Sequence, residues 1–200
     1  PWPQDVVRTL ENPIHPEGGM AFLRGTLAPG GAIVKQSAAS ARLMRHTGRA
    51  VVFAGAADLA ARIDDPDLDV TADDILVLQN IGPKGAPGMP EAGYLPIPRK
   101  LARQGVTDMV RISDGRMSGT ASGTIVLHVT PESASGGPLA LVRTGDRIRL
   151  DVPARRIDLL VGEAELAART PVPVPHAPPA RGYRKLYLDS VLQADEGCDF

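Results

Sequence analysis

Two glycine-rich segments of the chain carry side chains that could do chemistry. The segment GPKGAPGMPE (residues 82–91) ends on the carboxylate of Glu91, and SDGRMSGTASG (residues 113–123) holds Ser118 and Thr120 between glycines. Glycine lets a backbone approach a ligand closely. A serine in such a setting can be held exposed as a nucleophile or a proton acceptor, and a carboxylate oxygen is a ligand that Mg²⁺ takes. One glutamate is not a metal site, so further ligands would have to come from elsewhere.

Both side chains also have a plainer interpretation. Glu91 could be a carboxylate just before a helix, where the helix dipole stabilises it by about 0.3–1 kcal/mol. Ser118 could cap a turn with its hydroxyl, since serine and threonine readily bond to nearby backbone groups. Composition alone favours the helix interpretation for Glu91 and leaves both open for Ser118.

A serine hydrolase is a further alternative for the second segment. Ser118, His128 and Asp114 are the residue types of a catalytic triad, but GRMSG lacks the first glycine of the G-x-S-x-G elbow. His128 lies in the apolar run TIVLHVT, a setting more typical of a core or wall histidine. The sequence contains no HExxH, no P-loop and no dinucleotide-binding fingerprint.

The two segments follow apolar runs that read as strands. DDILVLQN (73–80) leads into the first segment and TDMVRIS (107–113) into the second. Because these are successive strands, we expect both segments at one edge of a sheet. Further strands are expected at 49–55, 123–129, 139–142, 146–152 and 156–161, with a hairpin over 20–38. Helices are expected at 56–64, in the second half of 94–106 and at 163–169, and 183–197 reads as a last helix or a tail. The sum is a β-rich α+β fold, a β-barrel with a few covering helices.

Composition excludes several classes of function. The chain has 200 residues, of which 43% are hydrophobic, and this suffices for one sizeable core. A net charge of -1 gives no long-range field for nucleic acid, so we expect no nucleic-acid partner. No run is long enough for a membrane span and no secretory signal is visible, so we expect no membrane partner and a cytoplasmic setting. Cys198 is the only cysteine, so this chain alone cannot build a disulfide or a thiolate-held cluster.

The chain divides into three parts by composition. Residues 1–17 read as an irregular lead-in from a preceding domain, 18–170 as the β-barrel domain, and 171–200 as a proline-rich strap followed by a C-terminal tail. The chain starts at Pro1 without methionine and stops after EGCDF, and we expect it to be a piece of a longer protein.

Five segments together resemble a known family: GGMAFLRGTLAPGGAIVK, GPKGAPGMPE, SDGRMSGTASGTIVLHVTPESASGGPLALV, GDRIRLDVPARRIDLLV and GYRKLYLDSVLQADEGCDF. In this order they are similar to the C-terminal part of the dihydroxyacid and sugar-acid dehydratases, the family that includes dihydroxyacid dehydratase and phosphogluconate dehydratase. The resemblance covers residues 18–200 and is closer to the sugar-acid branch, the arabinonate or xylonate dehydratases.

The resemblance implies a reaction and roles for three residues. A 2,3-dihydroxy acid loses water to give a 2-keto-3-deoxy acid, with an iron–sulfur cluster as Lewis acid and Mg²⁺ at the substrate carboxylate. By the matching motifs, Ser118 is the acceptor of the C2 proton, Thr120 contacts the substrate and Glu91 is a Mg²⁺ ligand. The residue types agree, because a serine hydroxyl becomes a useful base at neutral pH only beside a cation.

The resemblance also implies partners. The cluster cysteines and other Mg²⁺ ligands belong to the family's N-terminal domain, over which this domain closes as a swivelling β-barrel. We therefore expect the 200-residue chain alone to be inactive, and its partners to be its own N-terminal domain, a sugar acid or dihydroxy acid, and further copies in a dimer or tetramer. The alternative from a different class is a β-barrel binding or interaction module without catalysis.

Overall fold

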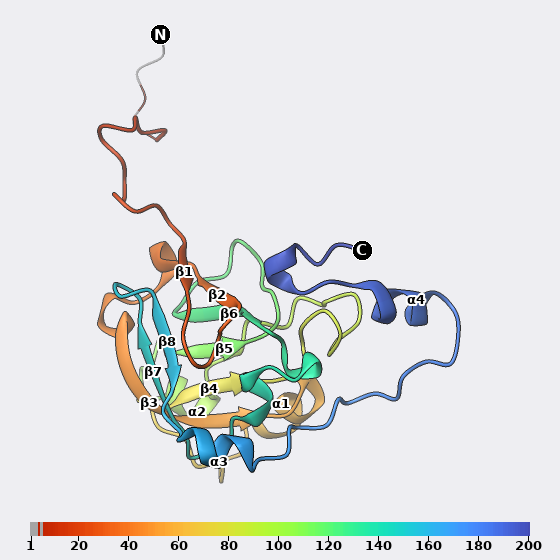
Figure 1. The fold of residues 1–200 in the computed structure, drawn as a ribbon. Coiled ribbons are helices and arrows are strands. Elements are labelled where there is room, and N and C mark those ends of the chain that lie inside the picture. The colour runs from red at the N-terminus through yellow and green to blue at the C-terminus, as the bar shows by residue number, and fades with distance from the viewer. Residues whose placement is uncertain (1–3, 5) are drawn as a thin grey trace.

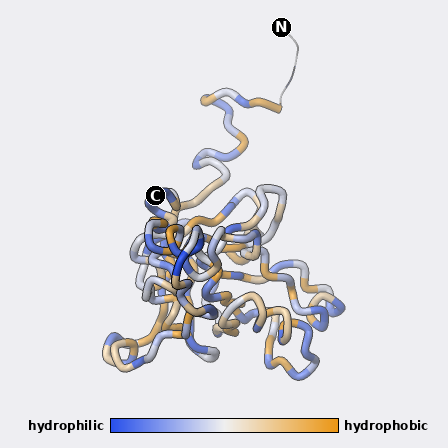
Figure 2. The backbone as a smooth tube through the Cα atoms, turned by 90° about the vertical axis from the view of Figure 1, so that its right-hand side faces the viewer, coloured by the Kyte–Doolittle hydropathy of each residue, from blue (hydrophilic) through white to orange (hydrophobic). Residues whose placement is uncertain are grey.

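The computed structural model describes residue 4 and residues 6–200. Positions 1–3 and 5 of the predicted lead-in lie outside the described residues. Figure 1 shows a curved sheet with helices around it and an N-terminal arm that leads away from it. The view turned by 90° in Figure 2 shows the same arm projecting from the body of the domain.

The described residues form one eight-stranded sheet in the order β1-β2-β6-β5-β4-β3-β7-β8. The strands are β1 (Ala21–Leu23), β2 (Gly31–Val34), β3 (Arg45–Phe53), β4 (Ile75–Leu78), β5 (Arg111–Ser113), β6 (Ile125–Thr130), β7 (Arg147–Asp151) and β8 (Arg156–Leu159). The central strands β3, β4, β5 and β6 are parallel, and all other neighbours are antiparallel. The predicted hairpin is the β1–β2 pair.

The sheet curls until its two edges meet. Arg24, just after β1, donates its N–H to the Arg155 carbonyl at 3.0 Å and accepts from the Ile157 N–H at 3.1 Å. The next residue is Gly25, where a Cβ atom would lie only 1.9 Å from the Ile157 carbonyl oxygen. Only glycine fits this approach, so the sequence permits the barrel to close nearly completely. The predicted β-rich α+β fold with a barrel-like sheet is confirmed.

The core has two parts, one on each face of the central strands. In β4, Ile75 and Val77 face the cluster inside the barrel, whereas Leu76 and Leu78 join the cluster that packs against α1 and α2. Successive side chains of a strand point to opposite faces. A strand buried on both faces must therefore be apolar throughout, as parallel strands covered by helices commonly are.

Four α-helices lie in the described part of the chain: α1 (Ala56–Arg62), α2 (Arg99–Ala102), α3 (Glu163–Ala167) and α4 (Tyr183–Ser190). They fall where helices were expected, and the 183–197 segment is a helix followed by a tail (Figure 1). No helix or strand occurs in the proline-rich residues 171–182. None of the helices within the described ranges is long and apolar enough to cross a membrane.

One expected strand is wrong. LALV at 139–142 was predicted to be extended, but Pro138–Leu141 is a 3₁₀ helix with Leu139 and Ala140 buried. Proline is favoured in the first turn of a helix because its missing N–H would be unpaired there. The preceding Gly137 packs against the Pro131 carbonyl oxygen, which would be 1.8 Å from a Cβ atom.

Candidate active site

The two glycine-rich segments leave neighbouring strands at the same edge of the sheet. Strands β4 and β5 are parallel and hydrogen-bonded, with Leu78 beside Ser113 at their carboxyl ends. The loop after β4 carries Glu91, and the loop after β5 carries Ser118. The prediction that both loops lie at one edge is confirmed. Carboxyl ends of parallel strands are common positions for ligand sites in α/β proteins.

Arg116 joins the two loops. Its Nε donates to the Met89 carbonyl at 2.7 Å, and its own carbonyl accepts from the Gly93 N–H at 2.7 Å. Its guanidinium also lies 3.7 Å from the Glu91 carboxylate. A Cβ atom at Gly93 would lie 2.6 Å from the Arg116 carbonyl oxygen, so glycine is needed for this approach. The sequence analysis did not single out Arg116, because nothing in its own segment indicates a partner in the first loop.

Ser118 and Thr120 form the tip of the second loop. Their hydroxyl oxygens are 2.9 Å apart, and the Ala121 N–H donates to the Ser118 carbonyl at 3.2 Å. Ser118 is half-buried and Thr120 is exposed. The hydroxyl-capped turn is therefore present, and it leaves both hydroxyls beside each other near the surface. Such a pair can bind two neighbouring oxygens of a polyhydroxy ligand.

Ser118 lines a small cavity of about 260 Å³ between β2, β6 and its own loop. The residues around the cavity are Met20, Ile33, Lys35, Met117, Ser118, Gly119, Leu127 and His128. Lys35 follows β2, and its ammonium group donates a hydrogen bond to the Gly119 carbonyl. The wall is thus mostly apolar, with one hydroxyl, one imidazole and one cation.

Glu91 does not precede a helix directly, because α2 begins only at Arg99. Its carboxylate is 46% exposed and has the Arg116 contact at 3.7 Å. A carboxylate so accessible fits a Mg²⁺ ligand, since Mg²⁺ commonly takes only one or two protein carboxylates and keeps several waters. Among the described residues, no group of three or more histidine, cysteine or acidic side chains could hold a metal. Within the described ranges, Glu91 therefore belongs to no cluster that would complete a metal site by itself.

An iron–sulfur cluster does not fit the side chains of this chain. Cys198 is the single cysteine of the sequence. Its sulfur lies 3.9 Å from the Met89 sulfur, and burial raises the pKa of its thiol. Cluster ligation needs several thiolates, so those of any cluster would have to come from outside this chain.

The proposed triad of Ser118, His128 and Asp114 is not assembled. Asp114 is buried and accepts the N–H groups of Ile81 at 2.9 Å and Ser133 at 2.8 Å, which occupies both carboxylate oxygens. Burial raises the pKa of Asp114. Within the described part of the chain, no hydrogen bond joins the His128 imidazole to Ser118 or to Asp114. Asp114 therefore holds together the starts of two loops.

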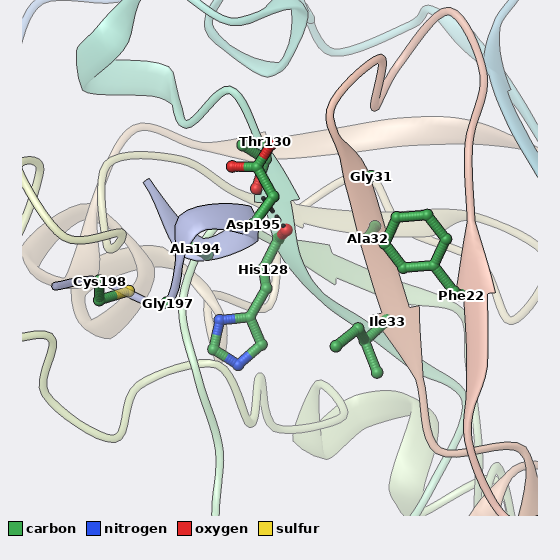
Figure 3. Close-up of a pocket in the computed structure, with 10 residues that line it drawn as sticks. All are labelled: Phe22, Gly31, Ala32, Ile33, His128, Thr130, Ala194, Asp195, Gly197 and Cys198. Carbon is green, nitrogen blue, oxygen red and sulfur yellow. Dashed lines mark hydrogen bonds between the residues drawn. The ribbon is translucent and has the colours of Figure 1, made fainter. Parts of the chain in front are cut away.

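His128 lies at a bulge in β6, where its φ of 53° shifts the pairing with β2 by one residue. Figure 3 shows its imidazole in a second cavity, of about 210 Å³, between β2 and residues 194–198. Burial and the nearby Arg116 lower the pKa of His128. The interpretation of His128 as a wall residue agrees with its lining both cavities.

A buried carboxylate accepts hydrogen bonds from the backbone of the first loop. Glu132 is 1% exposed and accepts the N–H groups of Lys84 at 3.0 Å and Gly85 at 2.9 Å. The Gln193 side-chain amide donates to the same carboxylate at 2.8 Å, which attaches the C-terminal tail. The sequence analysis missed Glu132. Its only signal is an acidic residue directly after a strand and a proline, a common pattern in turns.

Comparison with known proteins identifies the family. The profile of the dihydroxy-acid/6-phosphogluconate dehydratase C-terminal family matches residues 5–198. The chain belongs to this family. The predicted resemblance to this family is confirmed.

Individual relatives agree with the sugar-acid branch. The chain is 53% identical to L-arabonate dehydratase of Azospirillum brasilense over 203 residues and 54% identical to 6-deoxy-6-sulfo-D-gluconate dehydratase of Pseudomonas putida over 200 residues. Each match covers 98% of this chain. Identity to dihydroxy-acid dehydratase of Methanothrix thermoacetophila is 44% over 195 residues, or 96% of this chain. The chain spans about a third of the length of these relatives (35%, 34% and 35%).

Proposed function

We propose that the chain is the C-terminal domain of a hydro-lyase that converts a 2,3-dihydroxy sugar acid to a 2-keto-3-deoxy acid. One observation carries the proposal: the Ser118 and Thr120 hydroxyls, 2.9 Å apart, lie on a loop joined through Arg116 to the loop of Glu91. Membership of a dehydratase family and the names of the sugar-acid relatives support this choice of reaction.

Ser118 acts as the proton acceptor in this proposal. Its alkoxide takes the proton from C2, and the C2–H electron pair forms the C2=C3 double bond as the C3–O bond breaks. The departing 3-hydroxyl takes up the proton that Ser118 received from C2 and leaves as water, which returns Ser118 to its alkoxide. The enol then ketonises at C2 to give the 2-keto-3-deoxy acid. Thr120 binds a neighbouring substrate oxygen, because its hydroxyl adjoins that of Ser118.

Glu91 supplies one carboxylate ligand for Mg²⁺. The bound ion supplies positive charge at the carboxylate end of the sugar acid. Arg116 holds the Glu91 loop against the serine loop. The substrate carboxylate can therefore be bound near Glu91 while the C2–H bond lies at Ser118. Orientation of this kind accounts for a large part of many enzymatic rate accelerations.

The rest of the site belongs to an N-terminal domain outside this chain, which would contribute the thiolates of an iron–sulfur cluster and further Mg²⁺ ligands. Large apolar side chains on the N-terminal arm support such a partner. Val6, Val7, Leu10 and Ile14 are 79%, 75%, 95% and 81% exposed, and apolar side chains this exposed are stabilised when a partner covers them.

Several finer predictions go with this proposal. The division at residues 17 and 170, a dimeric or tetrameric assembly and a cytoplasmic setting remain predictions. So does the inactivity of the 200-residue chain without its N-terminal domain.

The test uses the full-length protein that contains this chain, purified without oxygen and supplied with iron and Mg²⁺. We expect 2-keto-3-deoxy acids from at least one member of a panel of sugar acids. Glu91→Gln should raise the Kd for Mn²⁺, used as a paramagnetic substitute for Mg²⁺ and measured by electron paramagnetic resonance. A protein that dehydrates none of the acids would contradict the proposal and favour a non-catalytic β-barrel binding module.

A further inference from the structure

Lys35 brings a positive charge to the serine loop from a distant part of the sequence. It follows β2, which pairs with β6, and its ammonium group donates to the carbonyl of Gly119, the residue after Ser118. Lys35 and Ser118 also line the same cavity of about 260 Å³. The sheet register therefore fixes the lysine beside the proposed base.

The ammonium group of Lys35 has more N–H donors than the Gly119 carbonyl can accept. It carries three N–H bonds, and the structure gives it one acceptor, the Gly119 carbonyl. Among the described residues, no carboxylate forms an ion pair with it. Two N–H groups are thus available to a ligand that enters the cavity.

The other charged or titratable groups near Ser118 do not provide an unpaired positive charge as Lys35 does. Arg116, on the serine loop, has the Glu91 carboxylate at 3.7 Å, which offsets its charge. His128, on β6, has its pKa lowered by burial, which favours the neutral imidazole. The remaining wall of the cavity comprises Met20, Ile33, Met117, Leu127 and the glycine backbone. In such a mostly apolar setting an unpaired cation interacts more strongly with a nearby anion than it would in water.

We propose that Lys35 is a further catalytic residue that binds a sugar-acid oxygen beside Ser118. The two free N–H groups of Lys35 stabilise the negative charge that develops on the departing 3-hydroxyl oxygen as the C2 proton moves to Ser118 and the C3–O bond breaks. Donors aimed at a developing oxyanion lower the barrier more than they strengthen ground-state binding. This inference rests on the proposed function. It adds Lys35 to the residues that the proposed function assigns to catalysis.

The test compares variants of the full-length enzyme on the sugar acid that it converts. Lys35→Met keeps the length of the side chain but removes the charge, and we expect kcat to fall roughly 100-fold with KM changed less than threefold. Lys35→Arg should retain more activity than Lys35→Met. Lys100→Met is the matched control, because Lys100 also donates to backbone carbonyls, those of Pro66 and Leu68, and lies outside the cavity.

Chemical rescue separates chemistry from loop structure. Lys35→Ala should regain activity when methylammonium is added and should not regain it with methanol, which is similar in size but uncharged. A loss of kcat that methylammonium does not relieve would mean that Lys35 acts only by holding the Gly119 carbonyl, and would overturn the inference.

Failure of this inference can be told from failure of the proposed function. If Ser118→Ala is inactive while Lys35→Met has wild-type kcat, only the role of Lys35 is wrong. If Ser118→Ala is active, or the wild-type protein converts no sugar acid, the proposed function fails and the role of Lys35 fails with it.

Discussion

The Arg116 guanidinium lies 3.7 Å from the Glu91 carboxylate and connects the loop of the proposed base to the loop of the proposed metal ligand. The same side chain donates to the Met89 carbonyl at 2.7 Å. These contacts cross between loops that are separated by more than twenty residues, so they depend on the parallel pairing of β4 and β5. Arg116 thus holds the loop of Ser118 against the loop of Glu91.

Replacing Arg116 should weaken catalysis without weakening metal binding. Arg116→Met removes the hydrogen bond to Met89 and the contact with Glu91, and the loss of about 1–3 kcal/mol corresponds to a fall in kcat/KM of roughly 5- to 150-fold. The Kd for Mn²⁺ should not rise, because a positive charge beside Glu91 has been removed. Arg103→Met is the control, since Arg103 is exposed and lies on neither loop. A variant that binds Mn²⁺ much more weakly would contradict this division of roles.

Glu132 should contribute to stability through the first loop. Glu132→Gln replaces one carboxylate oxygen with an N–H donor that faces the backbone N–H groups of Lys84 and Gly85. We expect the free energy of unfolding of the 200-residue chain, measured with urea, to fall by about 1–3 kcal/mol. Glu163→Gln in exposed α3 should change it by less than about 0.5 kcal/mol. Equal effects of the two substitutions would show that Glu132 does not support the loop.

Asp158 should make barrel closure sensitive to acid. It is 3% exposed and accepts from Arg149, Arg156 and the Thr26 N–H, beside the point where β1 meets β8. Hydrogen bonds from the two arginines and Thr26 outweigh burial and lower its pKa from 3.8 to about 2. A folded-state pKa below the unfolded value stabilises the fold above the unfolded pKa, and this stabilisation is lost as pH falls toward 2.

The measurement is urea unfolding of the wild type and Asp158→Asn between pH 2 and 6. The wild type should lose about 2 kcal/mol from this group over the acid range, so the difference between the two proteins should shrink as pH falls. Asp67→Asn, at an exposed loop carboxylate, controls for general charge effects. A difference that stays constant with pH would contradict the role of Asp158.

Much of the fold could be predicted because its signals are local. The apolar runs of β4 and β5 end in glycine-rich segments. These two local features were enough to predict both strands and to place the two loops at one edge of the sheet. LALV was misread because a short apolar run serves a buried 3₁₀ helix as well as a strand. The first half of β3 was missed because residues 45–48 are largely polar and pair with β7.

The candidate site was only half predictable for a related reason. Ser118, Thr120 and Glu91 lie in conspicuous segments, so their residue types could be noted directly from the sequence. Arg116, Glu132 and Lys35 acquire meaning only through partners far along the chain. Such contacts depend on strand order and loop path, which local patterns do not determine.

The most direct test of the account is the kcat/KM of Ser118→Ala against that of Ser122→Ala in the full-length protein. Both serines lie on the loop at 113–123, and Ser122 is exposed and outside the cavity of Ser118. Loss of a general base typically costs 10²- to 10⁴-fold, so we predict a fall of at least about 100-fold for Ser118→Ala and near wild-type activity for Ser122→Ala. If Ser118→Ala dehydrates the sugar acid as fast as Ser122→Ala, Ser118 is only a turn residue and the proposed mechanism is wrong.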